Sequence, residues 1–261
     1  MLLDRGINSI VFFDVETTGL DPQKDHITEV ALKRCAVNGA GERTIDRYSS
    51  LVQLPQGVTI PDNIVELTGL TTEQVNQEGK PIKIIESEIS KFFGDDTLVV
   101  AHNANFDLGF LRYTFGITPK YFICTKTIEA VAFPGNPNSL AKLHEYYYPN
   151  SEEQTHRAAD DVEKLSDVFD AQVKEIGTTE MTFFINKIAI LPERPLVYYP
   201  LLARYIDFTG KYVLKSKYDA LELRAKDWEE DSDFLGCLEA LGVENWSGYA
   251  SAVKMYNGEE V

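Results

Sequence analysis

The sequence predicts an α/β protein in which a mixed β-sheet is flanked by helices. Short runs of β-branched and aromatic residues, typical of buried strands, occupy residues 9–15, 27–37, 44–54, 97–101 and 121–125. Helical periodicity is found at residues 81–93, 105–115, 138–147 and 157–175. The first three strands follow one another closely enough for an antiparallel meander. The later strands alternate with helices, which indicates parallel crossovers.

Composition is that of an ordinary globular protein. The chain has 261 residues, of which 44% are hydrophobic and 25% charged. We predict two regions, residues 1–176 and a mostly helical C-terminal extension at residues 177–261 whose role the sequence leaves open. The extension contains a dense acidic run, Asp227–Asp233. We interpret this run either as a solvated helix face or as a docking surface for a basic partner.

The cysteines and the hydropathy indicate in which cellular compartment the protein works. Cys35, Cys124 and Cys237 are far apart and odd in number, which argues against a zinc site or a disulfide framework and favours a reducing cytoplasm. The first residues lack the shape of a signal peptide, and no apolar run is long enough to span a bilayer. We therefore expect a cytoplasmic protein without membrane contact.

Two acids share one face of the first predicted strand. The strand continues into Asp14-Val-Glu16, and side chains alternate along a strand, so Asp14 and Glu16 point to the same side. That side also carries Ile10 and Phe12. Two carboxylates would then stand together at the end of a buried strand. The alternative is a strand that simply runs out into an exposed loop.

Another acid begins a helix that follows a buried strand. The segment His102–Asp107 (HNANFD) comes directly after residues 97–101, and Asn105 is the expected N-cap of the helix. Asp107 lies on the helix face whose later residues are apolar. A first-turn aspartate can also merely complement the helix dipole, and this alternative stays open.

A third motif opens the longest helical segment. In His156–Asp161 (HRAADD), Asp161 lies along the edge of the apolar stripe, whereas Asp160 lines up with the polar side. Asp161 is therefore the candidate ligand. His156 precedes the helix and is a candidate base, while His144 has no comparable acidic partner in the sequence.

Four carboxylates and a histidine form the predicted site: Asp14, Glu16, Asp107, Asp161 and His156. Hard cations such as Mg²⁺ or Mn²⁺ take oxygen ligands. Two such ions about 3.5–4 Å apart can clamp the attacking and leaving oxygens of a phosphodiester. The sequence therefore predicts a metal-dependent nuclease with two divalent metal ions as cofactors.

The three motifs, in this order and at these separations, resemble the DEDDh family of 3′→5′ exonucleases. The resemblance covers about residues 8–175 and is strongest to the proofreading type, found as the epsilon subunit of bacterial DNA polymerase III and inside Gram-positive replicative polymerases. It extends to four segments without a metal role: Ile27–Leu32, Ile60–Thr71, Cys124–Thr127 and Asn138–Leu143. The resemblance implies a ribonuclease H-like sheet.

The resemblance also implies catalytic roles. Asp14 would bridge both metal ions, and Glu16, Asp107 and Asp161 would complete the two coordination spheres. Neutral His156 would take a proton from the water that attacks the terminal phosphodiester, releasing a nucleoside 5′-monophosphate. An ordinary histidine pKa of about 6.5 suits this task near neutral pH.

Substrate contacts follow from the same resemblance. The backbone around Thr17 and Thr18 would receive the hydroxyl of the 3′-terminal nucleotide, and Leu20 would form an apolar wedge against the last bases. His102 and Asn103 would line the channel beside the terminal nucleotides.

Charge limits how the chain can hold nucleic acid. The formal net charge is −16 and the sequence has no basic run, so the surface as a whole repels phosphates. A narrow pocket in which two divalent ions offset four carboxylates needs less global positive charge. We therefore expect weak grip and poor processivity unless a partner supplies the grip.

Several functions remain open at this stage. The favoured one is a 3′→5′ exodeoxyribonuclease acting mainly on single-stranded DNA, with a polymerase proofreading subunit as a special case in which residues 177–261 contact the polymerase. An exoribonuclease that trims RNA ends would use the same five residues. A non-catalytic scaffold would be marked by a lost ligand or base, and none is lost.

Overall fold

The computed structural model describes residues 2, 5–38, 41–149, 157–191 and 196–207. The chain divides into two compact units, residues 1–188 with 196–204, and residues 189–195 with 205–261. Residues 177–188 thus fold with the N-terminal region, beyond the predicted boundary at residue 176. Most of the predicted helical extension, from residue 208 onward, lies outside the described residues.

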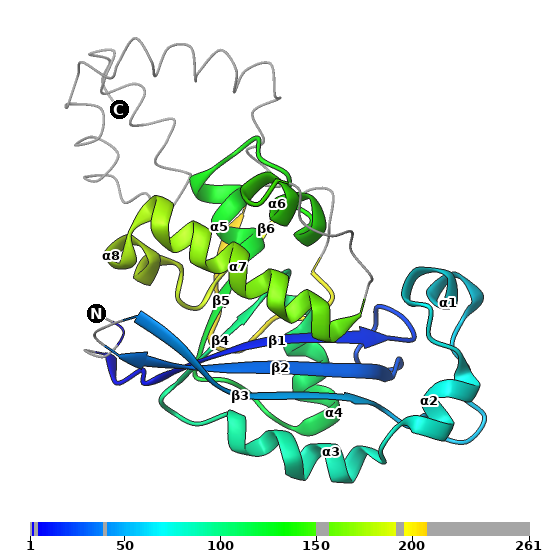
Figure 1. Ribbon diagram of the computed structural model, residues 1–261. Coiled ribbons are helices and arrows are strands. Elements are labelled where there is room, and N and C mark those ends of the chain that lie inside the picture. Colours follow the sequence, from blue (N-terminus) through cyan, green and yellow to red (C-terminus); the bar gives the residue numbers. More distant parts are fainter. Residues whose placement is uncertain (1, 3–4, 39–40, 150–156, 192–195, 208–261) are drawn as a thin grey trace, which may run out of the picture. The chain divides into compact units, whose positions relative to one another are not determined.

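A five-stranded mixed sheet forms the centre of the first unit, with the order β3-β2-β1-β4-β5 (Figure 1). β1 pairs antiparallel with β2, which pairs antiparallel with β3, whereas β4 runs parallel to both β1 and β5. The predicted meander followed by parallel crossovers is confirmed. The strands span Ser9–Thr17, Ile27–Asn38, Gly41–Leu51, Thr97–Ala101 and Tyr121–Cys124.

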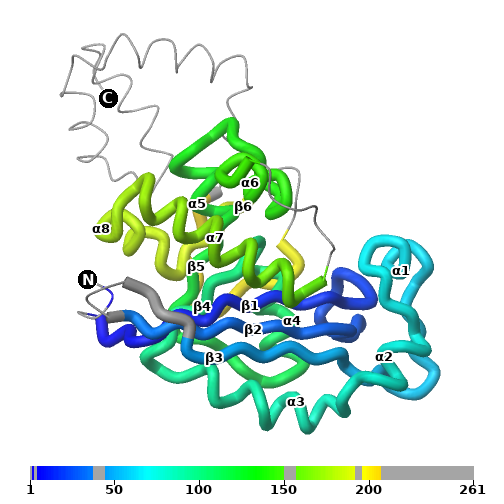
Figure 2. The backbone as a smooth tube through the Cα atoms, viewed as in Figure 1, coloured from blue at the N-terminus to red at the C-terminus, as the bar shows by residue number. Residues whose placement is uncertain are grey.

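Helices cover both faces of this sheet (Figures 1 and 2). On one face, α7 packs on β1 and β2 and is itself covered by α5 and α6. On the other face, α4 packs against β1, β4 and β5, and α3 lies beside β3, where Tyr48 donates a hydrogen bond to Glu88. The bounds of these helices are Ile82–Ile89 (α3), Ala104–Phe115 (α4), Thr125–Ala132 (α5), Leu140–Tyr147 (α6) and Ala158–Ile176 (α7).

Short elements complete the described chain, and the sequence did not predict them apart from η2, which falls within the helical segment predicted at residues 81–93. They are α1 (Asp62–Thr68), α2 (Thr72–Glu78), η2 (Ser90–Phe92), α8 (Thr178–Met181), η3 (Thr182–Phe184) and the two-stranded sheet of β6 (Lys187–Ile190) and β7 (Arg204–Asp207). Each spans seven residues or fewer, too few for a clear hydrophobic period. Among the described helices, none is both long and apolar enough to cross a bilayer.

The side chains of β1 alternate between the two faces of the sheet and are buried on both. Ile10 and Phe12 belong to a buried cluster that includes the apolar face of α7, and the Phe12 and Phe169 rings meet edge to face at 5.8 Å. Val11 and Phe13 are buried on the opposite face. The β1 face that packs on α7 is therefore the one that continues into Asp14 and Glu16.

Candidate active site

Three acids from β1 and α7 meet at the end of the core. One carboxylate oxygen each from Asp14, Glu16 and Asp161 lie within 4.8 Å of one another. Asp14 and Glu16 come from the β1 face that packs on α7, and Asp161 lies in the first turn of α7, buried to 5% exposure. Asp160 is exposed, as its place on the polar side of the helix predicted.

Asp107 stands at the same edge of the sheet, in the first turn of α4. It is only 2% exposed, and its carboxyl accepts a hydrogen bond from the backbone of Val15. It is not one of the three acids within 4.8 Å, yet it is close enough to Asp14 for its charge to raise the pKa of that residue. The structure therefore brings all four predicted acids to one region.

Burial and mutual repulsion disfavour ionisation of these acids. Burial, followed by the charges of Asp107, Asp161 and Glu16, raises the pKa of Asp14 well above its ordinary value. The pKa of Glu16 is raised to about 8, first by burial and then by nearby acids, among them Asp161. A partly buried set of oxygen donors that repel one another fits a hard divalent cation, whose charge would remove the repulsion.

The start of α4 differs from the prediction. The helix begins at Ala104, so Asn105 is not its N-cap but a buried residue inside the first turn. Asn103 precedes the helix in the left-handed conformation, with φ 67° and ψ 45°. Asparagine tolerates this conformation better than most residues, and its presence here turns the chain sharply from β4 into the helix that carries Asp107.

The turn after β1 uses its threonines to hold its own shape. The Thr17 hydroxyl donates to the Gly19 carbonyl at 2.6 Å, and the Thr18 hydroxyl accepts from the His26 N–H at 3.0 Å. The Thr18 N–H donates to the His26 carbonyl at 2.8 Å. Because this N–H is engaged, a contact with a nucleotide hydroxyl would need another backbone group of the turn. Leu20, at the tip, is 69% exposed.

His102 is engaged within the protein. Its Nδ1 lies 2.9 Å from the Thr125 hydroxyl and its Nε2 lies 3.0 Å from the Asn138 carbonyl. Since a carbonyl only accepts, Nε2 carries the proton in this arrangement. The imidazole therefore ties the end of β4 to α5 and to the segment before α6, and His102 would present its ring rather than a ring nitrogen to a nucleotide.

Two residues beside the acids were not recognised as functional from the sequence, Glu29 and Arg157. Glu29 of β2 is directly opposite Glu16 of β1, is 2% exposed, and accepts two hydrogen bonds from the Arg157 guanidinium at 2.9 Å. The available signal was an acid within the apolar run Ile27–Leu32. Arg157 follows His156, and the predicted base His156 itself lies outside the described residues.

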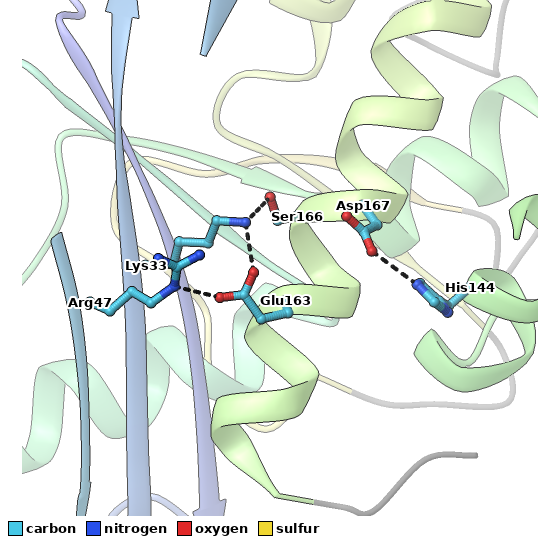
Figure 3. A network of polar contacts seen from close by, with 6 residues as sticks. All are labelled: Lys33, Arg47, His144, Glu163, Ser166 and Asp167. Carbon is cyan, nitrogen blue, oxygen red and sulfur yellow. Dashed lines mark hydrogen bonds and ion pairs between the residues drawn. The ribbon is translucent and has the colours of Figure 1, made fainter. Parts of the chain in front are cut away.

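Further polar contacts hold α7 against the sheet and against α6 (Figure 3). Lys33 of β2 donates to Glu163 and to Ser166, both at 2.9 Å, and Arg47 of β3 also donates to Glu163 at 2.7 Å. His144 of α6 lies 3.2 Å from a carboxylate oxygen of Asp167 on α7. The expectation that His144 lacks an acidic partner was therefore wrong, because the partner is distant in sequence.

Residues 11–169 match the protein family described as Exonuclease. Similar curated proteins include the PolC-type DNA polymerase III of Thermotoga maritima, 32% identical over 68% of this chain, and that of Bacillus subtilis, 37% identical over 40%. These alignments span only 13% and 7% of the two polymerases, so this chain corresponds to a small part of each.

Solved structures agree on the fold. Escherichia coli exonuclease I in complex with a dA16 oligonucleotide superimposes with a TM-score of 0.56 at 16% identity, over 67% of this chain and 42% of that one. The cell-death related nuclease CRN-4 gives 0.53 at 14% identity, over 66% and 65%. The predicted ribonuclease H-like architecture is confirmed.

A separate match lies at the C-terminal end. Residues 213–260 match the family described as Phage T7 gp5.9 RecBCD inhibitor. This segment is outside the described residues and includes the acidic run Asp227–Asp233.

The raised pKa values predict how the stability of the metal-free protein depends on pH. Glu16 releases its proton near 4.5 in the unfolded chain but at about 8 in the folded one, so the folded state binds more protons between these values and stability falls as pH rises through this window. In EDTA, the melting temperature of the wild type should therefore fall as the pH rises from about 4.5 to about 8. Asp14→Asn removes a repelling charge and should melt higher than wild type at pH 8.

Metal supplies the control for this melting series. Millimolar Mg²⁺ should raise the melting temperature of the wild type at pH 8 and have little effect on Asp14→Asn. Equal pH profiles for the two proteins in EDTA would contradict a site of repelling acids.

Proposed function

Because the chain belongs to the exonuclease family and is therefore a nuclease, we propose that it removes nucleotides from the 3′ ends of DNA, mainly single-stranded, and releases nucleoside 5′-monophosphates. One observation carries this proposal. Asp14, Glu16 and Asp161 come within 4.8 Å of one another, with Asp107 beside them, in the part of the chain that matches the family.

The four acids would hold two divalent cations, Mg²⁺ or Mn²⁺. Asp14 is the acid that the others surround, since the charges of Asp107, Asp161 and Glu16 all raise its pKa, and it would hold the cations together with them. Bound cations would supply the positive charge that offsets the charge developing on the phosphodiester and would acidify the attacking water. The acids themselves fix where that charge is held, because their backbones belong to β1, α4 and α7.

The remaining roles are assigned to neighbours of these acids. His156, which precedes Asp161 by five residues in the sequence, would take the proton of the attacking water. Leu20, exposed at the tip of its turn, would wedge against the last bases. His102 and Asn103 would line the path of the terminal nucleotides, His102 through its ring.

DNA is the preferred substrate in this proposal because the similar curated proteins are DNA polymerases. A proofreading role follows as a special case, in which the chain works beside a polymerase. The net charge of −16 favours a partner, because a chain that repels phosphates holds a DNA end weakly by itself.

The direct test is digestion of a 5′-labelled single-stranded DNA and an RNA of the same sequence, in parallel, with Mg²⁺. We expect a ladder that shortens from the 3′ end on DNA, with partly shortened strands released between cuts because the processivity is poor. Asp14→Asn should not cleave. A ladder mainly on RNA would move the function to RNA end-trimming with the same chemistry. No ladder on either substrate, for wild type and variant alike, would contradict an enzyme that acts alone.

Substitution of the predicted base tests the mechanism. His156→Ala should lower the turnover rate by about 10²–10⁴-fold, the range usual for loss of a general base, and should leave Mn²⁺ binding close to that of the wild type. A variant that mainly loses Mn²⁺ affinity would identify His156 as a ligand instead.

A second candidate function belongs to the C-terminal segment. Residues 213–260 match a family named for a RecBCD inhibitor, and acidic residues outnumber basic ones in this segment. Enzymes that bind DNA ends present basic surfaces to phosphates, and an acidic segment is complementary to such a surface. The segment is therefore proposed to bind and inhibit a RecBCD-type nuclease.

This second function is measured as inhibition of purified RecBCD on linear double-stranded DNA. The full chain carrying Asp14→Asn is the inhibitor to use, since it adds no cleavage of its own. It should slow degradation, and neutralising the acidic run should relieve the inhibition. The neutralising substitutions are Asp227→Asn, Glu229→Gln, Glu230→Gln, Asp231→Asn and Asp233→Asn. Equal RecBCD rates with and without the chain would refute this role.

A further inference from the structure

Glu29 is a buried acid beside the candidate site that belongs to none of the three motifs. We propose that Glu29, together with Arg157, is a positioning residue that fixes the start of α7 and thereby sets Asp161 against the acids of β1. The inference rests on the proposed function, since it concerns the same metal-binding acids, but it can be tested by metal binding alone.

Glu29 lies beside the clustered acids Asp14, Glu16 and Asp161 but is not one of them. Glu29 is directly opposite Glu16 in the antiparallel β1–β2 ladder, so the two side chains lie on the same face of the sheet. That face carries Asp14 two residues before Glu16. The Glu29 carboxylate is nevertheless absent from the set of oxygens within 4.8 Å of one another, which consists of Asp14, Glu16 and Asp161.

Both oxygens of Glu29 are committed to the start of α7. Oε1 accepts from Arg157 Nη2 at 2.9 Å, and Oε2 accepts from Arg157 Nε at 2.9 Å and from the Ala158 N–H at 3.2 Å. Planar, bidentate pairing of this kind fixes orientation as well as distance. Glu29 therefore acts on the helix rather than on a cation.

The Ala158 contact gives α7 an N-terminal cap from another element. Ala158 is the first residue of α7, and its preceding residue, Arg157, makes no side-chain cap of its own. The first N–H groups of a helix lack partners within it, and a negative charge at this end is favourable. Glu29 of β2 meets both needs, so the place where α7 begins is set by the sheet.

Asp161 depends on that starting point. It lies three residues after Ala158, in the first turn, so any shift of the helix start moves its carboxylate relative to Asp14 and Glu16. A displacement of about 1 Å in a catalytic constellation can cost about 10²-fold in rate. Holding the helix start is therefore a requirement of the site as well as of the fold.

A second attachment between the same strand and helix provides a matched control. Lys33 lies four residues after Glu29 on β2, on the same face, and donates to Glu163 and Ser166 of α7 (Figure 3). Glu163 and Ser166 follow Asp161 and belong to the part of α7 that packs over the core. Lys33→Met removes polar contacts between β2 and α7 without touching the helix start.

The experiment measures Mn²⁺ binding by calorimetry on the full chain for wild type and four variants: Glu29→Gln, Arg157→Gln, the Glu29→Gln/Arg157→Gln double variant, and Lys33→Met. Melting temperatures in EDTA are recorded for the same proteins. We expect the two single variants at the helix start to weaken Mn²⁺ binding at least about tenfold, and the double variant to be no weaker than either, because the pair acts as one unit. Lys33→Met should lower the melting temperature while leaving Mn²⁺ binding within about twofold of the wild type.

The sign of the Arg157→Gln effect separates positioning from charge. If Glu29 and Arg157 acted only through their charges, loss of the cation would tighten Mn²⁺ binding and loss of the anion would weaken it. Tighter Mn²⁺ binding by Arg157→Gln would therefore overturn the inference. It would also be overturned if Mn²⁺ affinity fell in proportion to the melting temperature in every variant, Lys33→Met included. Failure of the wild type to cleave DNA would instead count against the proposed function and leave this result intact.

Discussion

Mutual repulsion of buried and half-buried carboxylates is the constraint on which the rest of this structure depends. Asp14, Glu16, Asp107 and Asp161 converge at one edge of the sheet, where burial and neighbouring charge raise the pKa of Asp14 and of Glu16. Such an arrangement costs stability in the absence of a cation. The fold must therefore hold these groups in place by contacts made elsewhere.

The contacts that hold them lie mainly between α7 and the sheet. The core beneath the acids is apolar, with Phe12 of β1 packed against Phe169 of α7. Along β2, Glu29 and then Lys33 attach α7 at two points. Apolar packing supplies most of the attraction, whereas the paired charges determine where along the sheet the helix begins.

Catalysis and nucleic-acid binding place opposite demands on the charge of this chain. The acids that would hold cations need a local excess of negative charge, while DNA phosphates are repelled by the −16 of the whole chain. A site that concentrates its positive charge in bound cations resolves this conflict locally. Under the proposed function, grip over a longer stretch of DNA would come from a partner.

The sequence by itself determined the fold class, and it predicted the four acids, with Asp14 and Glu16 on one strand face and Asp161 along the apolar stripe of its helix. Strand alternation and helix periodicity allow this because they are local properties that survive into the folded state. Only the tertiary structure decided the rest. It paired Glu29 with Arg157, which lies 128 positions away, and it engaged both ring nitrogens of His102 in hydrogen bonds. It also placed the N-cap of α4 at Asn103 instead of Asn105. These outcomes depend on which segments the sheet order and the packing of α7 bring together, and no local pattern encodes such a pairing.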